Sequence, residues 1–138
     1  MSGRVFLVED DRDVLEYYEF LLVTEGFTIW ASETNGRAAI ARFREADTHP
    51  DAVILDHRLP GCNGDEVARA LLAVDPAVRI LYVTADDQGI EAARALGIRR
   101  LKRKPCSNER LLRNLEDAIL ERRRQLAAAG AATSLPAD

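Results

Sequence analysis

A short apolar run that ends in a single carboxylate constrains this chain more than any other feature. Residues 52–55 read Ala-Val-Ile-Leu, and Asp56 follows them directly. Four apolar residues in a row are typical of a strand that is buried on both faces of a parallel sheet. Asp56 is therefore predicted at the carboxyl edge of such a sheet, where open α/β sheets bind ligands. The alternative is that Asp56 only caps the turn predicted from Pro60, Gly61 and Gly64.

Three other apolar or mixed runs also end in side chains that can carry chemistry. In chain order these are Glu9 and Asp10 after residues 5–8, Thr84 after residues 80–83, and Lys104 with Pro105 after residues 100–102. Because parallel strands end at the same edge of a sheet, the acids, the hydroxyl and the ammonium are predicted to converge there. The competing interpretation is that the acids only complement the dipoles of the helices that follow.

Segments with helical spacing separate these strands. Helices are predicted at residues 12–24, 35–47, 65–74 and 88–96, and a long final helix is predicted to begin at the N-cap Ser107. Strands are predicted at residues 5–8, 27–31, 52–55, 79–83 and 100–102. Parallel strands need crossover helices, so this alternation predicts an α/β fold with a doubly wound, five-stranded parallel sheet and five helices.

Length and composition limit the remaining possibilities. A chain of 138 residues is long enough for one core, which is predicted to occupy residues 1–126. Residues 127–138 are rich in Ala, Gly, Thr, Ser and Pro, and are predicted to be a disordered tail or the start of a linker. The net charge of −4 gives no electrostatic case for direct nucleic-acid binding. No apolar run approaches the ~20 residues of a membrane span, and two cysteines without metal-ligand spacing suit the reducing cytoplasm.

The ordered set of motifs resembles one known family. Over roughly residues 4–120, the chain is similar to the receiver domains of two-component response regulators. The matching positions are Glu9-Asp10, Asp56, Leu59-Pro60-Gly61, Gly64, Thr84-Ala85 and Lys104-Pro105. The resemblance implies a flavodoxin-like strand order of 2-1-3-4-5.

The resemblance also implies a role for each matching residue. Asp56 would be the nucleophile that accepts a phosphoryl group, and Thr84 and Lys104 would contact the phosphoryl oxygens. Mg²⁺ would be bound by Asp10, by Asp56 and by the backbone carbonyl of Arg58, with Glu9 acting through water, and an oxygen-only site suits that ion. Pro105 would follow a cis peptide bond, which aims the Lys104 side chain.

Three further positions are expected to tune the response. In receivers the hydroxyl at the Thr84 position moves toward the phosphoryl group, and the residue at position 101 swings inward. Here that residue is Leu101 instead of the usual aromatic, so displacement of the helix predicted at residues 88–96 is expected to replace part of the switch. Arg58 and Asp86 occupy the positions that set the lifetime of the phosphorylated state, and they are expected to pair across the mouth of the site.

The resemblance implies a signalling switch that is not an enzyme beyond self-phosphorylation and slow autodephosphorylation. Its partners would be a histidine kinase or a histidine phosphotransfer protein, with a phosphorylation-dependent homodimer or a downstream protein as output. The main alternative is a Mg²⁺-dependent phosphohydrolase with an aspartyl nucleophile, but such enzymes need a second Asp where this chain has Arg58. Flavin binding is disfavoured, because acids follow residues 5–8 where a phosphate loop would be needed.

Overall fold

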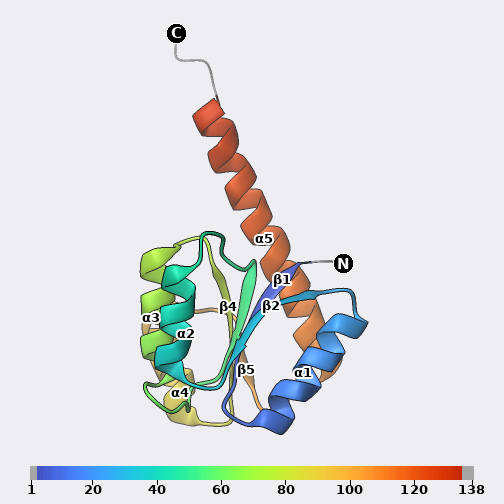
Figure 1. The fold of residues 1–138 in the computed structure, drawn as a ribbon, viewed down its shortest axis with the longest axis vertical. Coiled ribbons are helices and arrows are strands. Elements are labelled where there is room, and N and C mark those ends of the chain that lie inside the picture. The colour runs from blue at the N-terminus through green and yellow to red at the C-terminus, as the bar shows by residue number, and fades with distance from the viewer. Residues whose placement is uncertain (1–2, 135–138) are drawn as a thin grey trace.

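The computed structural model describes residues 3–134, and side chains up to residue 130. Five strands form one parallel sheet in the order β2-β1-β3-β4-β5 (Figure 1). The strands are β1 (Arg4–Val8), β2 (Thr28–Glu33), β3 (Ala52–Leu55), β4 (Arg79–Thr84) and β5 (Leu101–Arg103). The predicted doubly wound α/β fold and its strand order are therefore confirmed.

Helices cover both faces of the sheet. They are α1 (Arg12–Thr24), α2 (Gly36–Glu45), α3 (Gly64–Val74), α4 (Asp87–Ala95) and α5 (Asn108–Ser134). In Figure 1, α2, α3 and α4 lie on one face, and α1 and α5 lie on the other. Side-chain caps begin several of them: Asp11, Asn35 and Asp86 accept backbone N–H bonds at the starts of α1, α2 and α4. Ser107 does the same for α5, as predicted.

Each face of the sheet has its own apolar core. Strand residues alternate between the two, so that Phe6 and Val53 join the core beneath α2 and α3, whereas Leu7 and Ile54 join the core beneath α1 and α5. All four residues of β3 are buried. This two-sided burial is why residues 52–55 are uniformly apolar.

The final helix is longer than the composition suggests. Residues 127–134, which the sequence predicts to be a disordered tail or a linker start, continue α5 as helix, and residues 135–138 lie outside the described part. The physical reason is that alanine is the best helix former and a helix that already exists extends at little cost. Leu126 continues the helical spacing of Leu115 and Ile119 but is 46 % exposed, and the end of α5 projects from the body of the domain (Figure 1).

One buried arginine fixes α5 at the amino edge of the sheet. Arg122 is 7 % exposed and donates to Asp75, at the end of α3, over 2.8 Å. Asp51, just before β3, lies 3.8 Å from the same guanidinium. None of the described helices has the length and apolar character that crossing a bilayer requires.

The burial pattern yields a stability prediction. Phe43 is fully buried under β1 and β2, so Phe43→Ala should lower the free energy of unfolding by about 3–5 kcal/mol in urea titrations. Phe20 on α1 is 72 % exposed, so Phe20→Ala should change the free energy of unfolding by at most about 0.5 kcal/mol. An equal decrease in the free energy of unfolding in the two variants would contradict the burial of Phe43.

Candidate functional site

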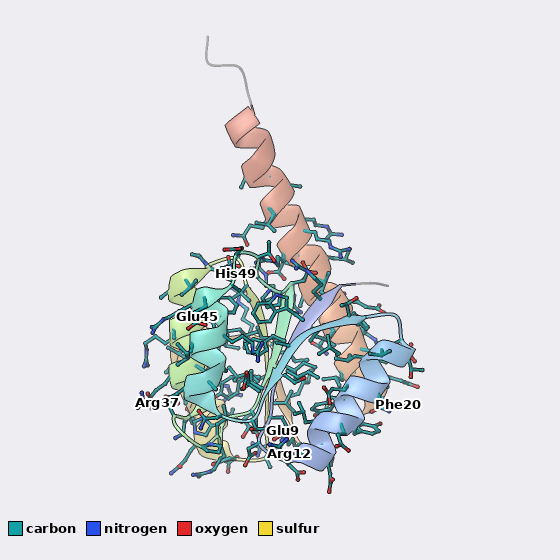
Figure 2. All side chains as sticks on the ribbon, viewed as in Figure 1. Glu9, Arg12, Phe20, Arg37, Glu45 and His49 are labelled. Carbon is teal, nitrogen blue, oxygen red and sulfur yellow. The ribbon has the colours of Figure 1, made fainter. Side chains whose placement is uncertain are left out.

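The candidate site lies at the carboxyl edge of the sheet, where four strands end side by side. Val8 and Leu55 are in register on β1 and β3, so the residues that follow them, Glu9 and Asp56, emerge level with each other. Lys104 follows β5 and donates its backbone N–H to the carbonyl of Thr84, which ends β4. Glu9 and the start of α1 lie at the end of the sheet opposite to His49 (Figure 2).

Three carboxylates crowd together at this edge. The carboxylate oxygens of Glu9, Asp10 and Asp56 lie within 4.8 Å of one another. Glu9 is 3 % exposed and the Asp56 side chain 12 %, whereas Asp10 is exposed at the rim of the cluster. Burial, together with the hydrogen bond and the charge of Glu9, raises the pKa of Asp10 above its ordinary value.

One ammonium group offsets part of this charge. Lys104 Nζ donates to Glu9 Oε1 over 2.7 Å and to Asp56 Oδ2 over 3.2 Å. Burial alone would lower the pKa of Lys104, but its bonds to Glu9 and Asp56 and their charges raise it. Three carboxylates and one ammonium leave negative charge in excess. The side-chain atoms of the cluster that could bind a metal ion are all carboxylate oxygens. The residues present therefore fit a small, hard divalent cation such as Mg²⁺.

Local backbone contacts orient the Asp56 carboxylate. The backbone N–H of His57 donates to Asp56 Oδ1 over 2.8 Å, while Lys104 holds Oδ2. The loop then turns through Gly61, whose φ of 87° favours glycine. Gly64 N–H donates to the His57 carbonyl over 2.7 Å, and a Cβ at Gly64 would overlap the carbonyl oxygen of Asp56. The turn residues noted in the sequence therefore hold the loop close beneath the carboxylate.

Thr84 ends β4 and Lys104 follows β5, the two strands beyond β3 in the sheet. Thr84 is 1 % exposed, and its hydroxyl accepts the backbone N–H of Asp86 over 3.1 Å. The Lys104–Pro105 peptide bond is cis, which is the geometry that the resemblance implies. The structure thus brings together the acid pair, Asp56, Thr84 and Lys104, which are far apart in the sequence.

An exposed ion pair connects the Asp56 loop with α4. Arg58 Nε donates to Asp86 Oδ2 over 2.5 Å, and its guanidinium also reaches Gln88 Oε1 at 3.2 Å. The N–H bond from Gln88, followed by the bond and charge of Arg58, lowers the pKa of Asp86. The pair expected from the sequence is present, at the position where Asp86 caps α4.

Leu101 lies on the edge strand and not among the carboxylates. It is half-buried opposite Tyr82 and lines a groove of about 670 Å³ bordered by β4, β5 and α5. Its basic neighbours are partly neutralised, because Arg100 pairs with Glu121 on α5 and Arg103 pairs with Asp87 on α4.

His57 and Tyr82 lie beside the site, although the sequence motifs did not predict either of them there. His57 is 5 % exposed, and its Nδ1 lies 2.5 Å from the hydroxyl of Tyr82, which is fully buried. A clue was present: a tyrosine inside an otherwise aliphatic buried strand needs a partner for its hydroxyl.

Two bacterial regulators are similar in sequence to most of this chain. The transcriptional regulatory protein CreB of Escherichia coli is 35 % identical over 94 residues, which cover 68 % of this chain and 39 % of that protein. The sensory transduction protein RegX3 of Mycobacterium tuberculosis is 36 % identical over 120 residues, covering 86 % of this chain and 51 % of the relative. This chain therefore spans about half or less of the length of these relatives.

Solved structures share the fold. A CheY-like receiver domain protein from Methanospirillum hungatei matches with a TM-score of 0.80 at 18 % identity, covering 91 % of this chain and 99 % of its own. The receiver domain of a Pseudomonas aeruginosa sensor histidine kinase, solved with magnesium in its active site cleft, matches with a TM-score of 0.76 at 24 % identity, covering 86 % and 98 %.

The family model of the response regulator receiver domain matches residues 5–116, which contain the whole acid cluster, Thr84 and Lys104. Receiver domains of this kind are signalling domains of two-component systems and not classical enzymes. On this match, together with relatives more than 30 % identical, the chain belongs to the response regulator receiver domain family.

Proposed function

We propose that this domain is a phosphorylation-activated switch in which Asp56 accepts a phosphoryl group from a phosphohistidine. The donor would be a histidine kinase or a histidine phosphotransfer protein. The observation that carries the proposal is the position of Asp56, whose carboxylate lies beside Glu9 and Asp10 and is held by Lys104 at 3.2 Å. Two free cysteines suit action in the reducing cytoplasm.

The proposed reaction exchanges one bond to phosphorus for another. An Asp56 oxygen forms a bond to the phosphorus, the bond from phosphorus to the histidine nitrogen breaks, and that nitrogen keeps the electron pair and is protonated. Glu9, Asp10, Asp56 and the Arg58 carbonyl would hold Mg²⁺, which offsets the repulsion between carboxylate and phosphoryl oxygens when it is bound. The His57 N–H fixes Asp56 Oδ1 and Lys104 holds Oδ2, so both oxygens of the proposed nucleophile are oriented.

Lys104 and Thr84 would stabilise the product. The ammonium already lies between Glu9 and Asp56, so only a small rotation would bring it onto a phosphoryl oxygen. The Thr84 hydroxyl would turn from the Asp86 N–H toward another phosphoryl oxygen. These moves would change the face formed by β5, α4 and α5, which a second copy of the chain or a downstream protein would read.

Arg58 argues against the hydrolase alternative. A phosphohydrolase with an aspartyl nucleophile needs an acid/base carboxyl two residues after that nucleophile, and a guanidinium cannot exchange protons near neutral pH. Here Arg58 is also engaged by Asp86 and Gln88. Turnover would therefore be limited to slow autodephosphorylation.

The first prediction concerns the phosphoacceptor. With acetyl phosphate and Mg²⁺, the wild-type protein should gain one acid-stable, hydroxylamine-sensitive phosphoryl group, and Asp56→Asn should gain none, because an amide is a poor nucleophile. Intact mass spectrometry measures both. Chelation of Mg²⁺ should abolish labelling of the wild type, and equal labelling of the Asn variant would place the acceptor elsewhere.

The second prediction concerns the metal. Asp10→Asn removes one carboxylate from the cluster, so Mg²⁺ affinity measured by calorimetry should fall about tenfold or more, as even outer-shell changes cost that much. The matched control is Asp13→Asn, the same charge change in the exposed first turn of α1. Equal affinities in the two variants would rule out the acid cluster as the metal site.

The third prediction concerns the lifetime of the phosphorylated state. Arg58→Ala removes the pair with Asp86 but keeps the backbone carbonyl, so the site opens to water and dephosphorylation should accelerate severalfold. The stability of folding should hardly change, because exposed pairs contribute little. The control Arg94→Ala removes an exposed arginine of α4 that pairs only locally with Glu91. An unchanged or slower dephosphorylation rate in Arg58→Ala would refute the role of the Arg58–Asp86 pair in keeping water from the site.

A further inference from the structure

A buried histidine–tyrosine pair lies directly beneath the site, and the proposed reaction does not use it. The Nδ1 atom of His57 and the hydroxyl of Tyr82 are 2.5 Å apart, and the two rings are inclined at 45°. Asp65 Oδ1 is 4.0 Å from the same nitrogen. Both side chains are almost inaccessible to water, so each needs the other as a partner for its polar atom.

The histidine of this pair also supports α4. Gly89, in the first turn of α4, packs so closely that a Cβ there would lie 2.8 Å from His57 Cβ and 2.8 Å from the Thr84 hydroxyl. The helix therefore rests on His57 and Thr84 together. On the other side, a Cβ at Gly64 would lie 2.8 Å from the Tyr82 hydroxyl, so α3 approaches the pair equally closely.

His57 thus lies between the Asp56 loop, the end of β4 and the first turn of α4. Its backbone N–H holds Asp56 Oδ1, its ring packs beside Thr84 under Gly89, and its imidazole is fixed from below by Tyr82. The adjacent residue, Arg58, connects the same loop to Asp86 and Gln88 at the start of α4.

We propose that the His57–Tyr82 pair is a positioning element that couples Asp56 and Thr84 to α4. The proposal rests on the proposed function, in which the Thr84 hydroxyl moves toward the phosphoryl group and vacates the space beneath Gly89. Because Tyr82 holds the imidazole, the ring does not turn into that space, and the first turn of α4 moves instead. Without the Tyr82 hydroxyl, the ring is free to fill the space and α4 stays in place.

The coupling takes on part of the role expected of residue 101. Leu101 is short and lies on the edge strand opposite Tyr82, so its rotation changes little exposed surface. A displacement of α4 supplies a larger change on the same face, and Arg103 would carry it to β5 through its pair with Asp87.

Hydrogen exchange of the α4 amides tests the proposal, with beryllofluoride and Mg²⁺ as the phosphoryl mimic. In the wild-type protein, the mimic should change exchange in α4. In Tyr82→Phe, the mimic should still reach full occupancy at saturation, because Asp56, Thr84 and Lys104 are unchanged. The α4 response at saturation should nevertheless fall about fivefold or more, the low end of typical coupling. A uniformly destabilised core would not separate binding from response in this way.

Two controls isolate the hydroxyl. Tyr17→Phe removes the same atom from an exposed tyrosine of α1, where its partner is Asn108, and should leave the α4 response intact. Phe43→Leu weakens the core at the far end of the sheet, beside His49, and should also leave it intact.

A double variant guards against misfolding of Tyr82→Phe, which leaves a buried imidazole without its partner. In His57→Phe with Tyr82→Phe, no buried polar atom is left without a partner and no hydrogen bond holds the ring at position 57, so the α4 response should be lost as in the single variant. A full α4 response in either variant at saturating beryllofluoride would overturn the coupling alone. A wild-type protein that takes up no beryllofluoride would overturn the proposed function and the coupling with it.

Discussion

Repulsion among three carboxylates at one edge of a parallel sheet is the constraint on which the rest of this structure depends. Glu9, Asp10 and Asp56 are held there because β1 and β3 are adjacent and in register, and both strands are buried on two faces. One ammonium, that of Lys104, offsets part of the charge by bonding to Glu9 and Asp56. The remaining negative charge makes the edge a site for a cation, and a cation in turn makes it a site for a phosphoryl group.

The contacts around this edge are of two kinds, and they suit different tasks. Backbone hydrogen bonds to Asp56 and tight glycine packing at Gly64 leave the nucleophile little freedom, as accurate positioning of a reacting group requires. Exposed pairs such as Arg58–Asp86 are weak and easily broken, so they suit control of access and not support of the fold. His57 belongs to the first kind, since its backbone N–H holds Asp56 and its ring packs closely against Gly89 of α4.

The family match and the course of α5 describe two different parts of this chain. The match to receiver domains establishes a signalling domain, and the chain spans about half or less of the length of CreB and RegX3. The α5 extension through residues 127–134 projects from the body of the domain at the end opposite to the site (Figure 1). Arg122 anchors the helix just before this extension through its bond to Asp75.

The sequence by itself determined the fold and most of the site. Apolar runs at strand period, helical spacing between them and turn glycines are local patterns, and they predict five strands and five helices with Glu9, Asp10, Asp56, Thr84 and Lys104 at strand ends. Only the tertiary structure decided that Lys104 bonds Glu9 as well as Asp56, that Tyr82 joins His57, and that Leu126 is exposed while α5 continues. These features depend on the packing of segments distant in sequence, which sets which buried polar groups become partners, and no local pattern encodes that choice.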